Sequence, residues 1–211
     1  MRATRTLPDG FVLGGTLRLA GNRRLIRLLN LLTVPWMVFA FFANALLAAL
    51  VRPRGWTFEF DSVVPPLLLY VLIVGLVTTI VLAIVLHEAA HGLVLWAHTG
   101  DRPVFGFKGW YFYTDAPGWY VGRAAMLATL AAPLVLVPTV GLPLIAWAPP
   151  AVSLLAYVGL VVNMTVAIGD LYAAVLVLRL RGPVIFGDEG GPPGEAGSWY
   201  VPSVSRDVEP V

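Results

Sequence analysis

The sequence predicts an all-α membrane protein, a bundle of about four transmembrane helices with a short β-hairpin-like aromatic loop on the cytoplasmic side. Composition is the first reason, because 58% of the 211 residues are hydrophobic and only 12% are charged, whereas about a quarter of the residues of soluble domains are charged. The second reason is that the apolar residues form runs long enough to cross a bilayer. The chain has no cysteine, which excludes disulfides, thiolate metal sites and cysteine nucleophiles.

Four apolar runs are the predicted membrane helices. They cover roughly residues 29–51, 65–98, 124–148 and 151–181. Each has the ~20 apolar residues that cross the hydrocarbon core. Three prolines within the third run predict a kinked or irregular helix there. The chain is accordingly divided into a cytoplasmic N-terminal segment, a four-helix transmembrane domain and a flexible, Gly/Pro-rich cytoplasmic tail: 1–28, 29–181 and 182–211.

Basic residues predict the orientation in the membrane. Twelve Lys and Arg lie before the first run, between the second and third, or at and after the end of the fourth, whereas the other side has only Arg52 and Arg54. The positive-inside rule therefore places both termini and the 99–123 loop in the cytoplasm of a multi-pass cell-membrane protein. The charges are orientation signals rather than a nucleic-acid patch, so membrane lipids are expected partners and nucleic acids are not.

The second run ends in a metal-binding pattern, since residues 87–91 read His-Glu-Ala-Ala-His. On a helix, His87 and His91 share one face and can bind one metal ion, while Glu88 can contact a water on that ion. Because the chain has no thiolate, the metal would be bound by His and carboxylate, which suits zinc. The alternative is a pair of histidines that are hydrogen-bonded inside a helical bundle.

Asp170 is the predicted third ligand. It follows 19 uncharged residues of the fourth run, and His87 follows 20 uncharged residues of the second. If both helices point the same way, the two side chains reach the same depth, near the cytoplasmic boundary of the hydrocarbon. The other downstream acidic residues are not on a rigid element at that depth: Asp101, Asp115, Asp188 and Glu189. An ionisable residue inside a membrane needs a partner, and the alternative to a metal is Arg179 or Arg123.

His98 is a rival ligand. It lies seven residues after His91 on roughly the same face, which places it ~10 Å further along the helix axis. It could share the ion only if the helix breaks at Gly92. We interpret His98 as an interfacial residue and leave a catalytic or ligand role open.

The 99–123 loop is a candidate platform for substrate. It contains eight aromatic residues, and residues 115–118 form a turn signal. Short strands are expected, and an extended peptide could add to their edge. The alternative is an aromatic belt that anchors the loop among lipid headgroups. The eight aromatic residues are Phe105, Phe107, Trp110, Tyr111, Phe112, Tyr113, Trp119 and Tyr120.

These motifs resemble the intramembrane site-2 metalloproteases and, more closely, a family of small bacterial and archaeal membrane proteins described as putative zincin peptidases. The resemblance covers most of residues 25–190 and rests on the HExxH helix, the Val104–Lys108 loop, and Asn163 and Gly169-Asp170 in the last run. It implies a zinc peptidase in which Asn163 orients substrate or a group that is hydrogen-bonded to a ligand. The alternative is an Asn that bonds another helix.

The predicted function is a membrane-embedded zinc metalloendopeptidase that cleaves a peptide or membrane-protein substrate near the cytoplasmic membrane boundary. Zinc bound by His87, His91 and Asp170 leaves a fourth position for water, and Glu88 takes a proton and passes it to the leaving amine. Two alternatives remain: a catalytically silent zinc-binding adaptor or chaperone, and a small transporter whose His and Asp line a path. A transporter would favour polar residues along several runs, whereas here they cluster at one depth.

The charge distribution predicts how the chain labels in intact cells. Cysteines introduced at Ala3 and Ser205 should resist an impermeant thiol reagent, because both termini are expected in the cytoplasm, and one at Gly55 should react. The cysteine-free parent serves as the blank. Labelling at either terminus would reverse the orientation.

Overall fold

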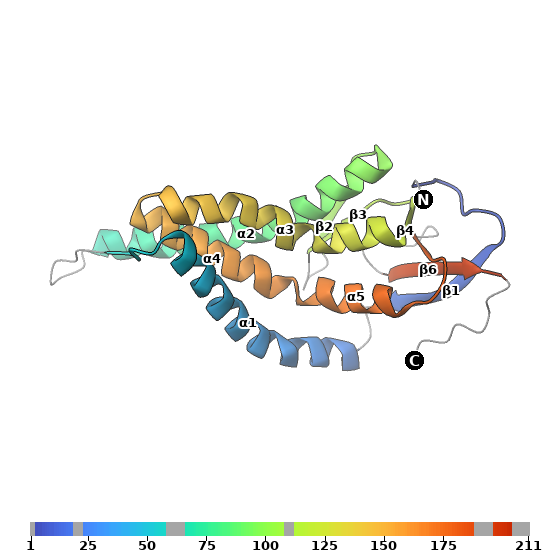
Figure 1. Cartoon of the computed structure of the whole chain (residues 1–211), viewed down its shortest axis with the longest axis horizontal. Coiled ribbons are helices and arrows are strands. Elements are labelled where there is room, and N and C mark those ends of the chain that lie inside the picture. Colours follow the sequence, from blue (N-terminus) through green and yellow to red (C-terminus); the bar gives the residue numbers. More distant parts are fainter. Residues whose placement is uncertain (1–2, 19–22, 58–65, 108–111, 188–195, 204–211) are drawn as a thin grey trace. The chain divides into compact units, whose positions relative to one another are not determined.

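The computed structural model describes residues 3–18, 23–57, 66–107, 112–187 and 196–203. Most of its elements are labelled in Figure 1. In chain order, the elements are β1 (Phe11–Arg18), α1 (Arg23–Val51), α2 (Pro66–Thr99), β2 (Val104–Phe107), β3 (Phe112–Asp115), β4 (Tyr120–Gly122), α3 (Arg123–Trp147), α4 (Pro150–Val166), α5 (Ile168–Arg179), β5 (Ile185–Gly187) and β6 (Ala196–Pro202).

The chain forms two compact units. The first comprises Met1–Asn30, Glu88–Ala132 and Gly169–Val211, and the second comprises Leu31–His87 and Pro133–Ile168. The boundaries fall within α1, α2 and α3 and at the start of α5. The unit division therefore differs from the sequence-based division at residues 28 and 181.

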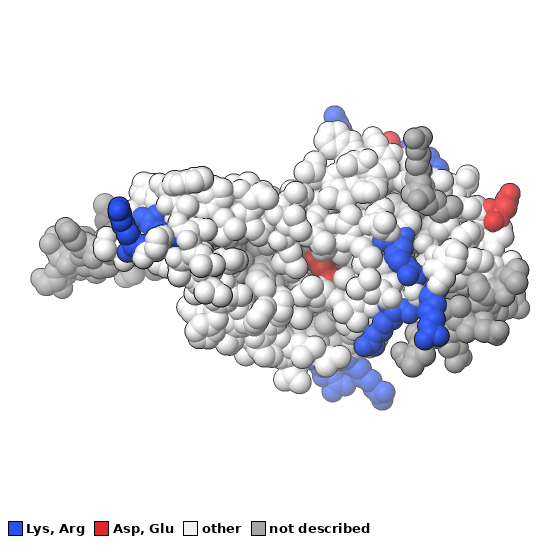
Figure 2. All heavy atoms as spheres, in the orientation of Figure 1, with Lys and Arg blue, Asp and Glu red and all other residues white. Residues whose placement is uncertain are grey.

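Three helices, α1, α2 and α3, are long and apolar enough to cross a membrane. Only 6% of the most apolar stretch of α2 is buried, and on α1 the side chains of Phe42 and Leu50 are 64% and 69% exposed. The face seen in Figure 2 is uncharged over long stretches of the helices. A contiguous apolar surface of this kind is typical of contact with lipid. These helices confirm three of the four predicted apolar runs as candidate spans.

The fourth predicted run is not one continuous helix. It is divided into α4 and α5, which meet at Ala167, and the two qualify as a span only as a pair. The expectation of an unbroken helix over 151–181 was therefore wrong. As a result Asp170 lies in the first turn of α5, where unpaired backbone N–H groups and the helix dipole favour a carboxylate.

The helices of the second unit pack around a small apolar cluster formed by Ala48, Ile145, Tyr157 and Leu160. Gly141 of α3 makes the close approach to α4 possible, because a Cβ there would lie 2.5 Å from a methyl carbon of Leu160. The Tyr157 hydroxyl donates to the carbonyl of Phe41 on α1 at 3.0 Å. These contacts join α1, α3 and α4.

The first unit contains an antiparallel sheet in the order β1-β6-β5-β4, which the sequence analysis did not predict. Strands β5 and β6 lie in the segment 182–211, which was expected to be a flexible tail. Gly14 and Gly15 of β1 lie against the indole of Trp199 in β6, and a Cβ at Gly15 would be 2.2 Å from that ring. Glycine is therefore required where the indole covers β1.

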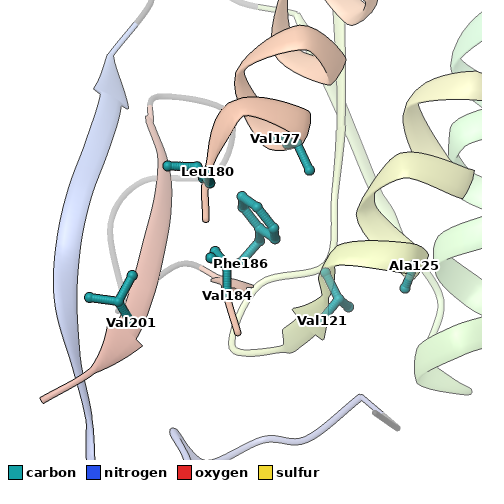
Figure 3. Packing of buried hydrophobic residues seen from close by; sticks show 7 residues of the cluster. All are labelled: Val121, Ala125, Val177, Leu180, Val184, Phe186 and Val201. Atoms are coloured by element: carbon teal, nitrogen blue, oxygen red, sulfur yellow. The ribbon is translucent and has the colours of Figure 1, made fainter. Parts of the chain in front are cut away.

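The sheet packs on the start of α3 and the end of α5 (Figure 3). Phe186 of β5 points into a cluster with Val121, Ala125, Val177 and Leu180. Burial of this apolar surface, at about 25 cal/mol per Å², holds the start of α3 against the end of α5. Helix α3 carries Thr129, which contacts His91, and α5 carries Asp170, which is one of the possible metal ligands.

The predicted hairpin is present, with β2 and β3 paired from Val104↔Asp115 to Phe107↔Phe112. Lys108, Trp110 and Tyr111 of the predicted platform lie outside the described residues. The ring of Phe105 in β2 lies so close to Gly92 of α2 that a Cβ on Gly92 would be 2.6 Å from it. The hairpin therefore packs directly on the helix that carries the HExxH motif.

Candidate metal centre

The HExxH motif lies within α2, which is continuous from Pro66 to Thr99. His87 and His91 are one turn apart and are 4% and 7% exposed. A buried imidazole must have its polar nitrogens satisfied, because an unsatisfied one costs about 1–3 kcal/mol. The partners of the two rings therefore determine which nitrogen of each can bind a metal.

The Nδ1 atom of His91 lies 2.7 Å from the carbonyl oxygen of Thr129 on α3. A carbonyl only accepts, so Nδ1–H donates and the proton-free nitrogen of the neutral ring is Nε2. In a regular helix the Thr129 carbonyl would accept from residue 133, but Pro133 has no N–H. The proline therefore frees the carbonyl that orients His91.

His87 is oriented in a similar way by Asn163 of α4. Its Nδ1 lies 3.1 Å from Asn163 Oδ1, and Asn163 Nδ2 donates to the carbonyl of Pro133 at 3.1 Å. Because the amide nitrogen of Asn163 is the donor to Pro133, the amide oxygen faces His87 and accepts from its Nδ1–H. The nitrogen of His87 that can bind a metal is then Nε2. Asn163 is only 1% exposed. Asn163 therefore contacts His87, one of the possible ligands, through its side-chain amide.

Asp170 completes a group of three possible ligands. Its Oδ2 lies 3.3 Å from Nε2 of His91, and one ligand atom each from His87, His91 and Asp170 lie within 4.8 Å of one another. Two ligands about 2.1 Å from one tetrahedral ion are about 3.4 Å apart, which matches the His91–Asp170 separation. The donors are two imidazoles and a carboxylate, a set that fits zinc.

Glu88 lies beside this group and is bound by a different element. The hydroxyl of Thr114 on β3 is 2.8 Å from Glu88 Oε2 and 3.0 Å from the Glu88 carbonyl oxygen. This donor fixes one carboxylate oxygen of Glu88 at the hairpin. The hairpin is therefore connected to the HExxH motif through a side chain as well as through Phe105.

Three residues of the site were missed by sequence reasoning: Thr114, Thr129 and Pro133. Pro133 carried a signal, because a proline within a helix always frees the carbonyl four residues earlier. The sequence does not say which donor reaches that carbonyl. Thr114 carried no signal, because its contact with Glu88 depends on how the hairpin packs.

The rival residues lie elsewhere. His98 is exposed, and its Nδ1 donates to the carbonyl of Val94 at 2.8 Å. Asp101 pairs with Arg5 and accepts from Trp119 Nε1. Arg123, the alternative partner for Asp170, donates to the carbonyls of Leu180 and Gly182. The structure does not describe Asp188 and Glu189.

A comparison with protein families bears on the same segment. Residues 80–182 match the model of a family described as "Putative zincin peptidase". The match confirms the resemblance inferred from the HExxH and Asn–Gly-Asp motifs, and it includes all three possible ligands. No curated protein and no solved structure matched the chain.

The geometry predicts the metal content of the purified protein. It should contain about one zinc per chain, and Asp170→Ala or His87→Ala should lose most of it, because each removes one of three ligands. Elemental analysis of detergent-purified protein measures this. His98→Ala is the matched control and should keep its zinc. Full retention of zinc in Asp170→Ala would eliminate Asp170 as a ligand.

Proposed function

We propose that this chain is a membrane-embedded zinc metallopeptidase that hydrolyses peptide bonds near the cytoplasmic membrane boundary. The observation that carries the proposal is the 3.3 Å approach of Asp170 to a His91 ring whose other nitrogen is bound to Thr129. The zincin family match supports the same class of chemistry. A carboxylate of the HExxH motif beside three ligands is the arrangement that metal-assisted hydrolysis needs.

His87, His91 and Asp170 would hold the zinc. When bound, the ion supplies Lewis acidity, which polarises a scissile carbonyl and makes water more acidic. Thr129 and Asn163 hold the two imidazoles through Nδ1, which keeps each ring in the tautomer that presents Nε2 to the metal. Because the rings are buried and hydrogen-bonded, little reorientation is needed when the metal binds.

Glu88 is the proposed general base and acid. Its carboxylate takes a proton from the attacking water and returns it to the leaving amine. Thr114 donates to Oε2 of Glu88, so that oxygen is fixed while the second carboxylate oxygen can accept the proton. An extended substrate that pairs with the edge of the β2–β3 hairpin would pass beside Glu88, because Thr114 belongs to that hairpin.

The membrane setting of the site is also a proposal. The 20 residues that precede His87 are uncharged, and α2 is exposed along most of that length. The excess of basic residues near the termini and the 99–123 loop supports a cytoplasmic position for the end of α2. Peptides and membrane-protein segments are the substrates that can reach such a site.

Exchange of Glu88 separates the enzyme from a silent zinc-binding adaptor. Glu88→Gln should keep its zinc and lower peptide hydrolysis by about 10²–10⁴-fold, because the carboxylate is the proton carrier and not a ligand. The assay uses reconstituted protein and a pool of peptides and single-span membrane proteins. Equal cleavage by wild type and Glu88→Gln would contradict the mechanism, and absence of cleavage in both would favour the adaptor.

Thr114 should matter through its hydroxyl alone. Thr114→Val preserves the shape of the side chain but leaves Glu88 Oε2 without this donor, so kcat should fall by about 10–100-fold with KM and zinc content little changed. Thr114→Ser restores the donor and should retain most of the activity. A serine variant as slow as the valine variant would show that Thr114 acts through packing instead.

A further inference from the structure

The first unit contains a cavity of ≈ 380 Å³, several of whose lining residues lie within one helical turn of residues of the candidate metal centre. Its walls come from the end of α2, the start of α3, α5, the turn before β4, and the sheet. The lining is mostly apolar, with Leu95, Met126, Leu130 and Leu176 from the helices and two indoles, Trp119 and Trp199. Protein interiors contain few voids larger than a water molecule, so a cavity of this volume has room for a bound group.

Two of the cavity's walls, those from α2 and α3, begin close to His91 and to Thr129, the residue that orients His91. Leu95 lies one helical turn after His91. Leu130 directly follows Thr129, whose carbonyl orients His91. The cavity therefore begins one turn or less from the imidazole that lies against Asp170.

The other two walls begin equally close to the site. Tyr172 and Ala173 of α5 follow Asp170 by two and three residues, and Asp115 directly follows Thr114. Four separate segments thus lead from the site into one cavity. A substrate whose scissile bond lies at the metal would place a neighbouring side chain into it.

The lining selects against charge. Its charged side chains are Asp115 and Arg179; the Asp115 carboxylate accepts from the N–H of Ala116 at 2.7 Å, and Arg179 is exposed. A charged side chain that entered the apolar part would lose its hydration without a matched partner. Aromatic and aliphatic groups instead gain about 25 cal/mol for each Å² buried.

We propose that this cavity is a specificity subsite that binds a bulky apolar side chain, such as Phe, Leu or Met, next to the scissile bond of a peptide substrate. The assignment rests on the proposed peptidase function, since it names the substrate class of the same site. It is the arrangement expected of a site in which a few polar groups fix orientation and an apolar pocket supplies affinity.

The first test fills the cavity. Wild type should cleave peptides with Phe, Leu or Met beside the scissile bond about tenfold or more faster, in kcat/KM, than matched peptides with Ala or Asp. Ala173→Phe places a ring inside the cavity and should reverse the preference towards Ala. Ala128→Phe, at an exposed position of α3, is the control and should keep the wild-type preference. The absence of any side-chain preference in wild type would overturn the subsite.

The second test reads binding without turnover. In the Glu88→Gln background, an apolar peptide should change the tryptophan emission, because Trp119 and Trp199 line the cavity, and the change should be lost with Ala173→Phe but not with Ala128→Phe. Such binding without hydrolysis in wild type would keep the subsite and reject the peptidase. Tryptophan emission that does not change when the peptide is added would overturn the peptide subsite. So would quenching of that emission by lipids with brominated acyl chains if Ala173→Phe abolishes the quenching, because the cavity would then hold lipid.

Discussion

The candidate metal centre depends on one backbone carbonyl, that of Thr129, which has no hydrogen-bond donor within its own helix. Pro133 has no N–H, so the carbonyl of Thr129 lacks its usual partner inside α3, and a buried carbonyl without a donor would be costly. His91 supplies the donor at 2.7 Å, which turns its Nε2 towards Asp170. A proline that disfavours the helix on its own thus sets the direction of a possible metal ligand, and the carbonyl of the same proline accepts from Asn163, whose side-chain oxygen contacts His87.

The possible ligands and the proposed base are positioned by different parts of the chain. Helices α3, α4 and α5 contact the two imidazoles, whereas the β2–β3 hairpin contacts Glu88 through Thr114. The hairpin also packs on Gly92, one turn after Glu88. A movement of the hairpin would displace Glu88 without moving the three possible ligands away from one another, so the proposed metal binding and the proposed proton transfer would be separable in variants.

The sequence indicated the candidate residues that the structure brings within 4.8 Å of one another, His87, His91 and Asp170, but not the fold around them. HExxH has fixed helical geometry, and Asp170 was found because ionisable residues are scarce in apolar runs. The break at Ala167 was missed because no proline marks it, yet Asp170 still lies at 3.3 Å from His91. The sheet was missed because β1 and β6 are at opposite ends of the chain, and the register of such distant strands depends on tertiary packing, here of Trp199 over Gly14 and Gly15.

The most direct test of the three-ligand centre is the X-ray absorption spectrum of zinc in the purified protein. The structure predicts two imidazole nitrogens and carboxylate oxygen at about 2.0–2.2 Å, because one ligand atom each from His87, His91 and Asp170 lie within 4.8 Å of one another. His91→Ala should lose one imidazole contribution from any zinc that remains. A wild-type spectrum with oxygen ligands alone, or one that His91→Ala leaves unchanged, would contradict the account.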